Sequence, residues 1–136
     1  MAERLRIGAL AERAGVTLRT IRHYEALGLM AAEDRVGRGQ HYYSPQTVLR
    51  LRKIDQLKAL GLSLEEVGEV IDLYFTDPSG LAAKRQVLSI LRRHLAAAEE
   101  KIAALQQFRG DLEGHIERFE AWLASHPDGY EGEEHG

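Results

Sequence analysis

Residues 17–29 (TLRTIRHYEALGL) carry cationic and hydroxyl side chains of the kind that bind phosphate. At 100° per residue, Arg19, Arg22 and His23 fall on one side of a helix, and Glu25 is the only acidic residue of the stretch. Guanidinium groups bind phosphate oxygens through charge and forked donors. The stretch predicts a helix face that lies on a nucleic-acid backbone, and a solvated surface helix with ordinary cations is the alternative.

Two short helices joined by a glycine turn would position this face. The first carries apolar residues at spacings of three and four, which are Ile7, Leu10, Ala11 and Ala14. Gly15 is predicted to end this helix and Thr17 to cap the second one, which Gly28 stops. The buried side of the second helix is predicted to hold Leu18, Ile21 and Leu27. This is the helix-turn-helix pattern.

After residue 30 the apolar residues no longer follow the helical spacing of three and four. Residues 31–43 are predicted to form two short strands joined by a tight turn, which would make a wing. Ser44 as N-cap and Pro45 at the first helical position predict a helix that runs to Gly61. A capping-box spacing at residues 63–66 (SLEE) starts another helix that is predicted to continue to about Phe75.

A heptad repeat fills most of the C-terminal half. Eleven positions from Leu88 to Leu123 alternate gaps of three and four over about five heptads, as in a left-handed coiled coil, and all but Arg109 are apolar. A helix of residues 81–124 with such a stripe needs a partner, most economically a second copy of the chain. The alternative is a helix folded back on its own N-terminal domain. The predicted dimer interface consists of Leu88, Leu91, Leu95, Ile102, Leu105, Leu112, Ile116, Phe119 and Leu123.

Charge and composition narrow the class of protein. Residues 1–60 hold 11 Lys and Arg against 6 Asp and Glu, a net of +5, whereas residues 61–136 hold 7 against 15, a net of −8. A basic module that contacts an anionic partner is therefore predicted. With no cysteine, disulfides, thiolate metal sites and cysteine nucleophiles are excluded. No apolar run approaches 18 residues and the N-terminus lacks a signal-peptide core, so no membrane span and a cytoplasmic location are expected.

The side chains also predict which groups would touch DNA. The N-terminal residues of a second helix in this motif approach base edges, and here they are Thr17, Arg19 and Thr20. Phosphate contacts are predicted for Arg22, His23 and Tyr24. Neither a catalytic constellation nor a metal-ligand or cofactor-binding pattern is present, so an enzyme is not expected.

Three segments together resemble the N-terminal domain of the MerR family of bacterial transcriptional regulators. They are IGALAERAGVTLRTIRHYEALGLM, GRGQHYYS and LRKIDQLKALGLSLEEVGEVIDL. The resemblance implies a mainly α fold. It would consist of a winged helix-turn-helix DNA-binding domain followed by a long coiled-coil dimerisation helix. His23 replaces a family tyrosine, and His41 replaces an arginine that reaches phosphate. Arg38 is expected to supply that charge, and Tyr43 completes the predicted wing contacts.

The resemblance also implies organisation and mechanism. The DNA-binding domain would span residues 1–76, a linker 77–80, the dimerisation helix 81–124, paired as an antiparallel coiled coil, and a flexible acidic tail 125–136. A homodimer would bind an inverted repeat in the over-long spacer of promoter DNA and distort it for RNA polymerase. An unidentified small-molecule effector is a further expected partner. The aromatic residues Tyr74, Phe75, Phe119 and Trp122 would line its pocket or simply pack.

Two other functions stay open at this level. One is an effector-independent repressor or architectural DNA binder of the same fold. The other is a coiled-coil adaptor that uses its basic half on an acidic protein. The adaptor would have no DNA affinity at moderate salt, which distinguishes it from both DNA-binding functions.

Overall fold

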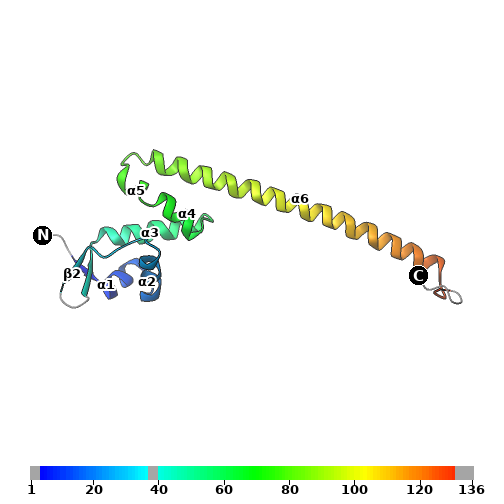
Figure 1. The fold of residues 1–136 in the computed structure, drawn as a ribbon, viewed down its shortest axis with the longest axis horizontal. Coiled ribbons are helices and arrows are strands. Elements are labelled where there is room, and N and C mark those ends of the chain that lie inside the picture. Colours follow the sequence, from blue (N-terminus) through cyan, green and yellow to red (C-terminus); the bar gives the residue numbers. More distant parts are fainter. Residues whose placement is uncertain (1–3, 37–39, 131–136) are drawn as a thin grey trace. The chain divides into compact units, whose positions relative to one another are not determined.

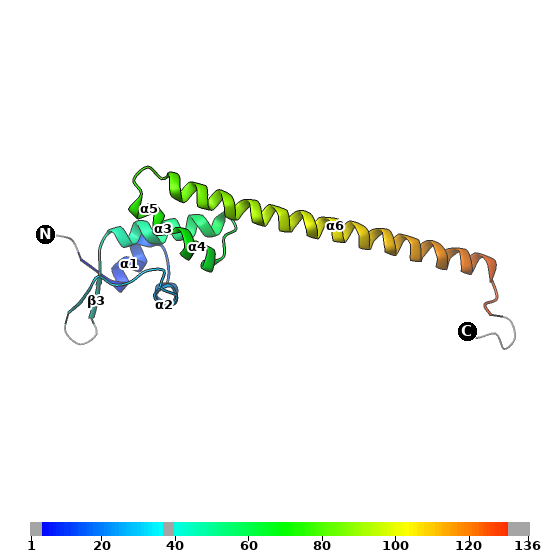
Figure 2. The ribbon, with the colours of Figure 1, turned by 45° about the horizontal axis from the view of Figure 1, so that its top comes forward.

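A computed structural model describes residues 4–36 and 40–130, and Figures 1 and 2 show its ribbon from two directions. The chain divides into two compact units, Met1–Arg92 and Arg93–Gly136. The division falls inside the last helix rather than in the punctuated segment 77–80. The reason is that the start of this helix buries Ala83, Val87 and Ile90 within the first unit.

The helix-turn-helix consists of α1 (Ile7–Ala14) and α2 (Leu18–Ala26). Gly15 ends α1 in the left-handed conformation at φ 71°, and its amide donates to the carbonyl of Ala11 at 2.9 Å. Thr17 caps α2, because its Oγ1 accepts the amide of Thr20 at 3.0 Å. The predicted glycine stop and the predicted N-cap are both confirmed.

A small antiparallel sheet supplies the wing. It contains β1 (Leu5–Arg6), β2 (Asp34–Val36) and β3 (Gln40–Tyr43) in the order β1-β3-β2. Leu5 pairs with Tyr43 and Arg35 pairs with His41. The two-stranded wing is confirmed, whereas β1 was not predicted because two residues are too few to show a strand period.

The second helix group consists of α3 (Gln46–Ala59), α4 (Leu64–Val70) and α5 (Leu73–Thr76). The capping box of α4 is confirmed, with Ser63 and Glu66 exchanging hydrogen bonds of 2.9 and 3.1 Å. The prediction of one helix from Ser63 to Phe75 is wrong, because α4 ends at Val70. The break lets Ile71 enter the core while Asp72 turns outward to an arginine of α3.

One core holds the first unit together. Side chains from both helix pairs, the sheet and the start of the last helix meet in it, so α2 is fixed from several sides. The largest fully buried side chains are Tyr43, Leu10, Ile21, Leu51, Ile54, Leu57, Ile71, Ile90, Val67 and Val70.

The last helix, α6 (Leu81–Ser125), runs unbroken through Gly110 and Gly114. Its first turn is capped by Asp77, whose Oδ2 accepts the amide of Ala82 at 3.0 Å. This bond and those from Ser79 lower the pKa of the Asp77 carboxyl. Beyond Ser125 the chain turns, and the His126 ring stacks on Trp122 with 4.3 Å between ring centroids. In the described part of the chain, no helix combines the length and the apolar character that crossing a membrane requires.

Candidate nucleic-acid interface

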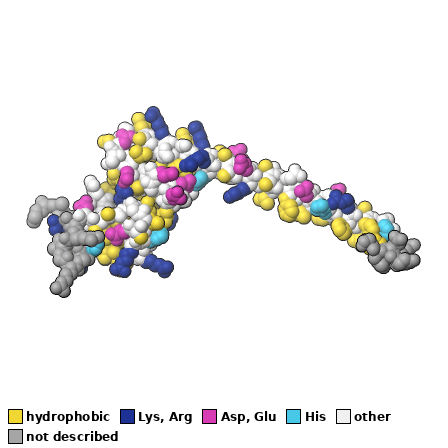
Figure 3. Space-filling view, in the orientation of Figure 1, with side chains coloured by type: hydrophobic (Ala, Val, Ile, Leu, Met, Phe, Trp, Pro, Cys, Tyr) yellow, Lys and Arg dark blue, Asp and Glu magenta, His cyan; other side chains and the backbone are white. Residues whose placement is uncertain are grey.

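The outer face of α2 carries the predicted cations. Thr17, Arg19, Arg22 and His23 are exposed, and Thr20 is half-buried. In Figure 3, Lys and Arg side chains project from the part of the first unit where Figure 1 places α2. These exposed donors can reach an anionic surface without any change in the core.

The buried side of α2 differs from the prediction. Ile21 and Tyr24 are buried, but Leu18 is 41% exposed and Leu27 is 51% exposed, so the prediction for these two leucines is wrong. Helix α2 has only nine residues, and the reversal at Gly28 (φ 77°) brings the following Leu29 and Met30 into the core instead. A short helix that ends in a tight turn gives its last apolar residue no partner.

The single carboxylate of α2 is bonded to the wing. Glu25 Oε1 accepts a hydrogen bond of 3.0 Å from the hydroxyl of Tyr43 on β3. Burial, this hydrogen bond and the Glu25 charge together raise the pKa of Tyr43 to about 12, while nearby Arg22 acts in the opposite direction. Glu25 is therefore bonded to the wing, and Arg19 and Arg22 make no ion pair with it in the described part of the chain.

Two hydroxyls lie at the start of α2. Thr17 Oγ1 accepts the amide of Thr20 and donates to Thr20 Oγ1 at 3.0 Å. The Thr20 hydroxyl therefore keeps its own proton for an external acceptor. Thr17 holds the helix end, and Thr20 presents a donor there.

The other predicted contact residues occupy different surroundings. Tyr24 is 6% exposed and Tyr43 is 1% exposed, so both side chains belong to the core of the isolated chain. His41 on β3 is half-buried. Arg38 lies outside the described residues. The structure thus brings Arg19, Arg22 and His23 together and sets the two tyrosines behind them.

An arginine of α3 that sequence reasoning did not single out secures the end of α2. Arg50 Nε donates to the carbonyl of Leu29, and its Nη1 lies 2.9 Å from Asp72 Oδ1. The guanidinium also lies over the Phe75 ring, 5.8 Å from its centroid. The sequence holds no short-range signal for these contacts, because the partners of Arg50 lie 21 and 22 residues away.

The predicted dimer interface lies on α6, and most of it is open to solvent. Exposed fractions of its large side chains in the second unit run from 43% at Leu112 to 71% at Phe119. Figure 3 shows hydrophobic side chains along this part of α6. Among the described residues, no group of three or more His, Asp and Glu side chains is placed to hold a metal ion.

Comparison with known proteins identifies the family of this chain. Residues 5–73 match the family model described as MerR HTH family regulatory protein, and residues 48–115 match the model described as MerR, DNA binding. The nodulation protein NolA of Bradyrhizobium sp. (strain NC92) is 36% identical over 109 residues, which are 80% of this chain and 42% of that relative. The chain therefore spans less than half the length of this curated relative.

Solved structures agree on the fold. PbrR691 from Ralstonia metallidurans CH34, in complex with lead(II), has a TM-score of 0.65 at 23% identity, over 80% of this chain and 84% of that one. HiNmlR, a MerR family regulator lacking the sensor domain and bound to promoter DNA, has a TM-score of 0.52 at 19% identity, over 87% of each chain. The family models cover the helix-turn-helix, the wing and the second helix group, and this chain belongs to the MerR family of DNA-binding transcriptional regulators.

Proposed function

We propose that the chain acts as an antiparallel homodimer that binds an inverted repeat in a promoter spacer and distorts the DNA to control transcription. The observation that carries this proposal is the exposed apolar stripe of α6, because it requires a second copy. Two copies present two α2 helices, and a two-fold protein matches a two-fold site.

The stripe has the size and spacing of a dimer seam. Leu95, Ile102 and Leu105 are 59%, 54% and 67% exposed in the single chain. Because each side chain is only partly exposed, covering it contributes about 1–2 kcal/mol. Their spacings of seven and three residues place them on one side of α6, where a partner helix covers them all together.

The charges of α6 support the antiparallel orientation. Its first half, residues 81–101, holds five Lys and Arg against two Glu, whereas residues 102–125 hold two Arg against four Asp and Glu. An antiparallel pair sets the basic half of one helix beside the acidic half of the other. A parallel pair would place like charges together.

We assign the contact residues from their positions. Arg19, Thr20 and Thr17 at the start of α2 face base edges, and Arg22 and His23 face phosphates. His41 makes the wing contact, and Arg38 remains a sequence prediction. We give buried Tyr24 and Tyr43 a positioning role, because they hold α2 against the core and the wing.

DNA distortion and action on RNA polymerase complete the proposal. HiNmlR, which resembles this chain in fold, is bound to promoter DNA and lacks the sensor domain. A dimer grips the backbone on both sides of its centre, so it can alter DNA shape between the two half-sites. Localisation in the cytoplasm follows from such a role.

The first test is selection of bound genomic fragments by the purified chain, followed by footprinting of the best site and by in vitro transcription. The proposal expects a protected inverted repeat within an unusually long promoter spacer, with changed transcript levels. A selection that yields no preferred sequence would overturn it. The matched control is the Arg19→Ala, Arg22→Ala double variant, which should select nothing.

A further inference from the structure

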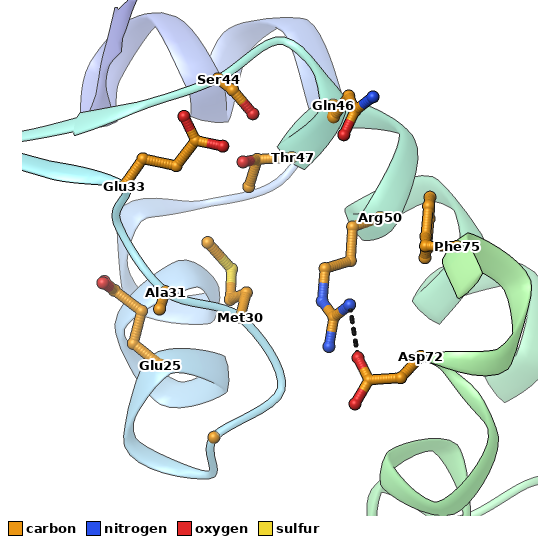
Figure 4. Close-up of a pocket in the computed structure, with 11 residues that line it drawn as sticks. Glu25, Met30, Ala31, Glu33, Ser44, Gln46, Thr47, Arg50, Asp72 and Phe75 are labelled. Atoms are coloured by element: carbon orange, nitrogen blue, oxygen red, sulfur yellow. Dashed lines mark ion pairs between the residues drawn. The ribbon is translucent and has the colours of Figure 1, made fainter.

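A cavity of about 530 Å³ opens in the first unit between the end of α2, the segment before the wing, the start of α3 and α5. Figure 4 shows the side chains that converge on it. The volume lies in the range of small-molecule sites. The DNA contacts proposed above use none of the residues that line it.

The cavity wall contains a hydroxyl with no partner in the described part of the chain. Thr47 on α3 is 7% exposed, and its Oγ1 makes no hydrogen bond with any described residue. Every fully buried side-chain oxygen among the described residues has a partner, so this hydroxyl is open to the cavity. Figure 4 shows it pointing toward the side where Glu33 lies. A recessed polar group gains free energy from a bonded ligand or water.

The charge of the lining specifies the ligand class. The lining contains three carboxylates, from Glu25, Glu33 and Asp72, and one guanidinium, from Arg50. Asp72 already neutralises Arg50, and Glu25 accepts the Tyr43 hydroxyl. The Glu33 side chain is exposed, and it has no ion pair or hydrogen bond with any side chain outside residues 34–40 that the structure describes. An ammonium group suits this free carboxylate beside a hydroxyl.

Met30, Ala31 and Phe75 supply the apolar part of the lining, beside the polar Ser44 and Gln46. Met30 is buried, and the ring of Phe75 is 43% exposed and forms part of the wall. These groups suit a short hydrophobic body attached to the cation. We propose that this cavity is a binding site for a small organic cation, held by Glu33 and Thr47 and packed against Met30 and Phe75. The ligand would touch both the turn after α2 and the α5 segment that leads into α6.

The test uses benzylammonium as probe and benzyl alcohol as its neutral counterpart, titrated into the full ¹⁵N-labelled chain. The proposal expects saturable amide shifts at Gly28, Ala31 and Phe75 with benzylammonium and at least about fivefold weaker binding of the alcohol. Shifts that rise without saturation, or equal binding of both compounds, would overturn it.

Variants locate the binding. Glu33→Gln and the near-isosteric Thr47→Val should each weaken benzylammonium binding about fivefold. Glu65→Gln, which removes an exposed carboxylate of α4 outside the cavity, should leave it unchanged. Binding that neither cavity variant alters would overturn the proposal. The Leu105→Glu variant, which is designed to break the proposed dimer, gives a further check. Saturable binding seen only in this variant would also overturn the proposal, because a partner chain would then fill the cavity in the dimer.

Discussion

The two parts of α6 carry similar apolar residues and use them differently. Within residues 81–92, Ala83, Val87 and Ile90 are at most 7% exposed, because helices of the first unit cover them. Within residues 93–125, every large apolar residue of the predicted seam is at least 43% exposed. The start of α6 therefore belongs to the core of its own chain, whereas the apolar residues beyond it are exposed in the single chain.

This difference separates two kinds of stability. A side chain in a closed core contributes to folding of one chain at any concentration. A side chain on an open stripe contributes only when a partner is present, so its effect depends on protein concentration. Mutations in the two parts of α6 should therefore be distinguishable by dilution.

The largest effect is expected from Leu105→Glu. In the proposed dimer this change buries two carboxylates in an apolar seam and costs about 5 kcal/mol or more per dimer. Sedimentation should show a monomer at micromolar concentration, and operator binding should be lost. Gln107→Glu adds the same charge about 160° away around the helix from the seam and should leave the dimer intact. A dimeric Leu105→Glu would refute the seam.

A pair of isoleucines tests the comparison directly. Ile90 is 0% exposed, so Ile90→Ala should reduce the free energy of unfolding by about 3 kcal/mol through lost burial and a cavity. Ile102 is 54% exposed in the single chain, so Ile102→Ala should instead weaken self-association. Chemical denaturation at several protein concentrations separates the two effects. A concentration-independent loss in Ile102→Ala would mean that Ile102 packs within its own chain.

Local signals account for what the sequence predicted well. Gly15, Thr17 and the Ser63–Glu66 box act through bonds between near neighbours, so residue type and spacing suffice to predict them. The cationic face of α2 was predicted for the same reason. The seam stays a prediction, which rests on a heptad repeat over many turns that is typical of a coiled coil.

Contacts between distant segments account for what the sequence did not predict. Strand β1 exists because β3 pairs with it, and α4 ends where Asp72 meets Arg50 of another helix. The tyrosines of the predicted interface are typical phosphate ligands by residue type. Only the fold shows that Tyr43 is 1% exposed and bonded to Glu25. The cavity around Thr47 also has no signal in any single segment.

An intermediate effect is expected from Arg22→Ala in the first unit. Removing one phosphate contact should weaken binding to all DNA sequences alike and reduce the slope of log affinity against log salt by about one. Fluorescence anisotropy over a salt series measures both quantities. Arg85→Ala, which removes an exposed arginine from the start of α6, is the matched control and should keep the slope. An unchanged slope in Arg22→Ala would remove Arg22 from the phosphate contacts.

A smaller effect is expected from Gly110→Ala on the open part of α6. A Cβ added at Gly110 meets nothing within 4 Å in the single chain, and alanine favours a helix by about 1 kcal/mol over glycine. The variant should therefore raise the melting temperature by a few degrees. Gly114→Ala, whose Cβ would lie 3.7 Å from an Arg118 nitrogen, should behave similarly. A loss of stability in both variants would show that a partner backbone approaches this face.

The smallest effect at neutral pH concerns the hydrogen bond between Glu25 of α2 and Tyr43 of the wing. Burial and Glu25 raise the pKa of Tyr43 from 10.0 to about 12 in the folded chain, so folding favours the neutral phenol. This contribution to stability is complete below pH 10 and is lost as the pH rises from 10 toward 12. Tyr43→Phe should remove this alkaline dependence, measured as the free energy of unfolding across that range.

Glu25→Gln separates the effect of the Glu25 charge on Tyr43 from the effect of their hydrogen bond. The amide oxygen can still accept the phenol proton, so α2 should keep its place, but the carboxylate charge that raises the pKa of Tyr43 is gone. Absorbance titration should then show the pKa of Tyr43 moving part of the way back toward 10, since burial still raises it. A pKa that does not move would mean that burial and the hydrogen bond, which the amide keeps, set it without the charge of Glu25.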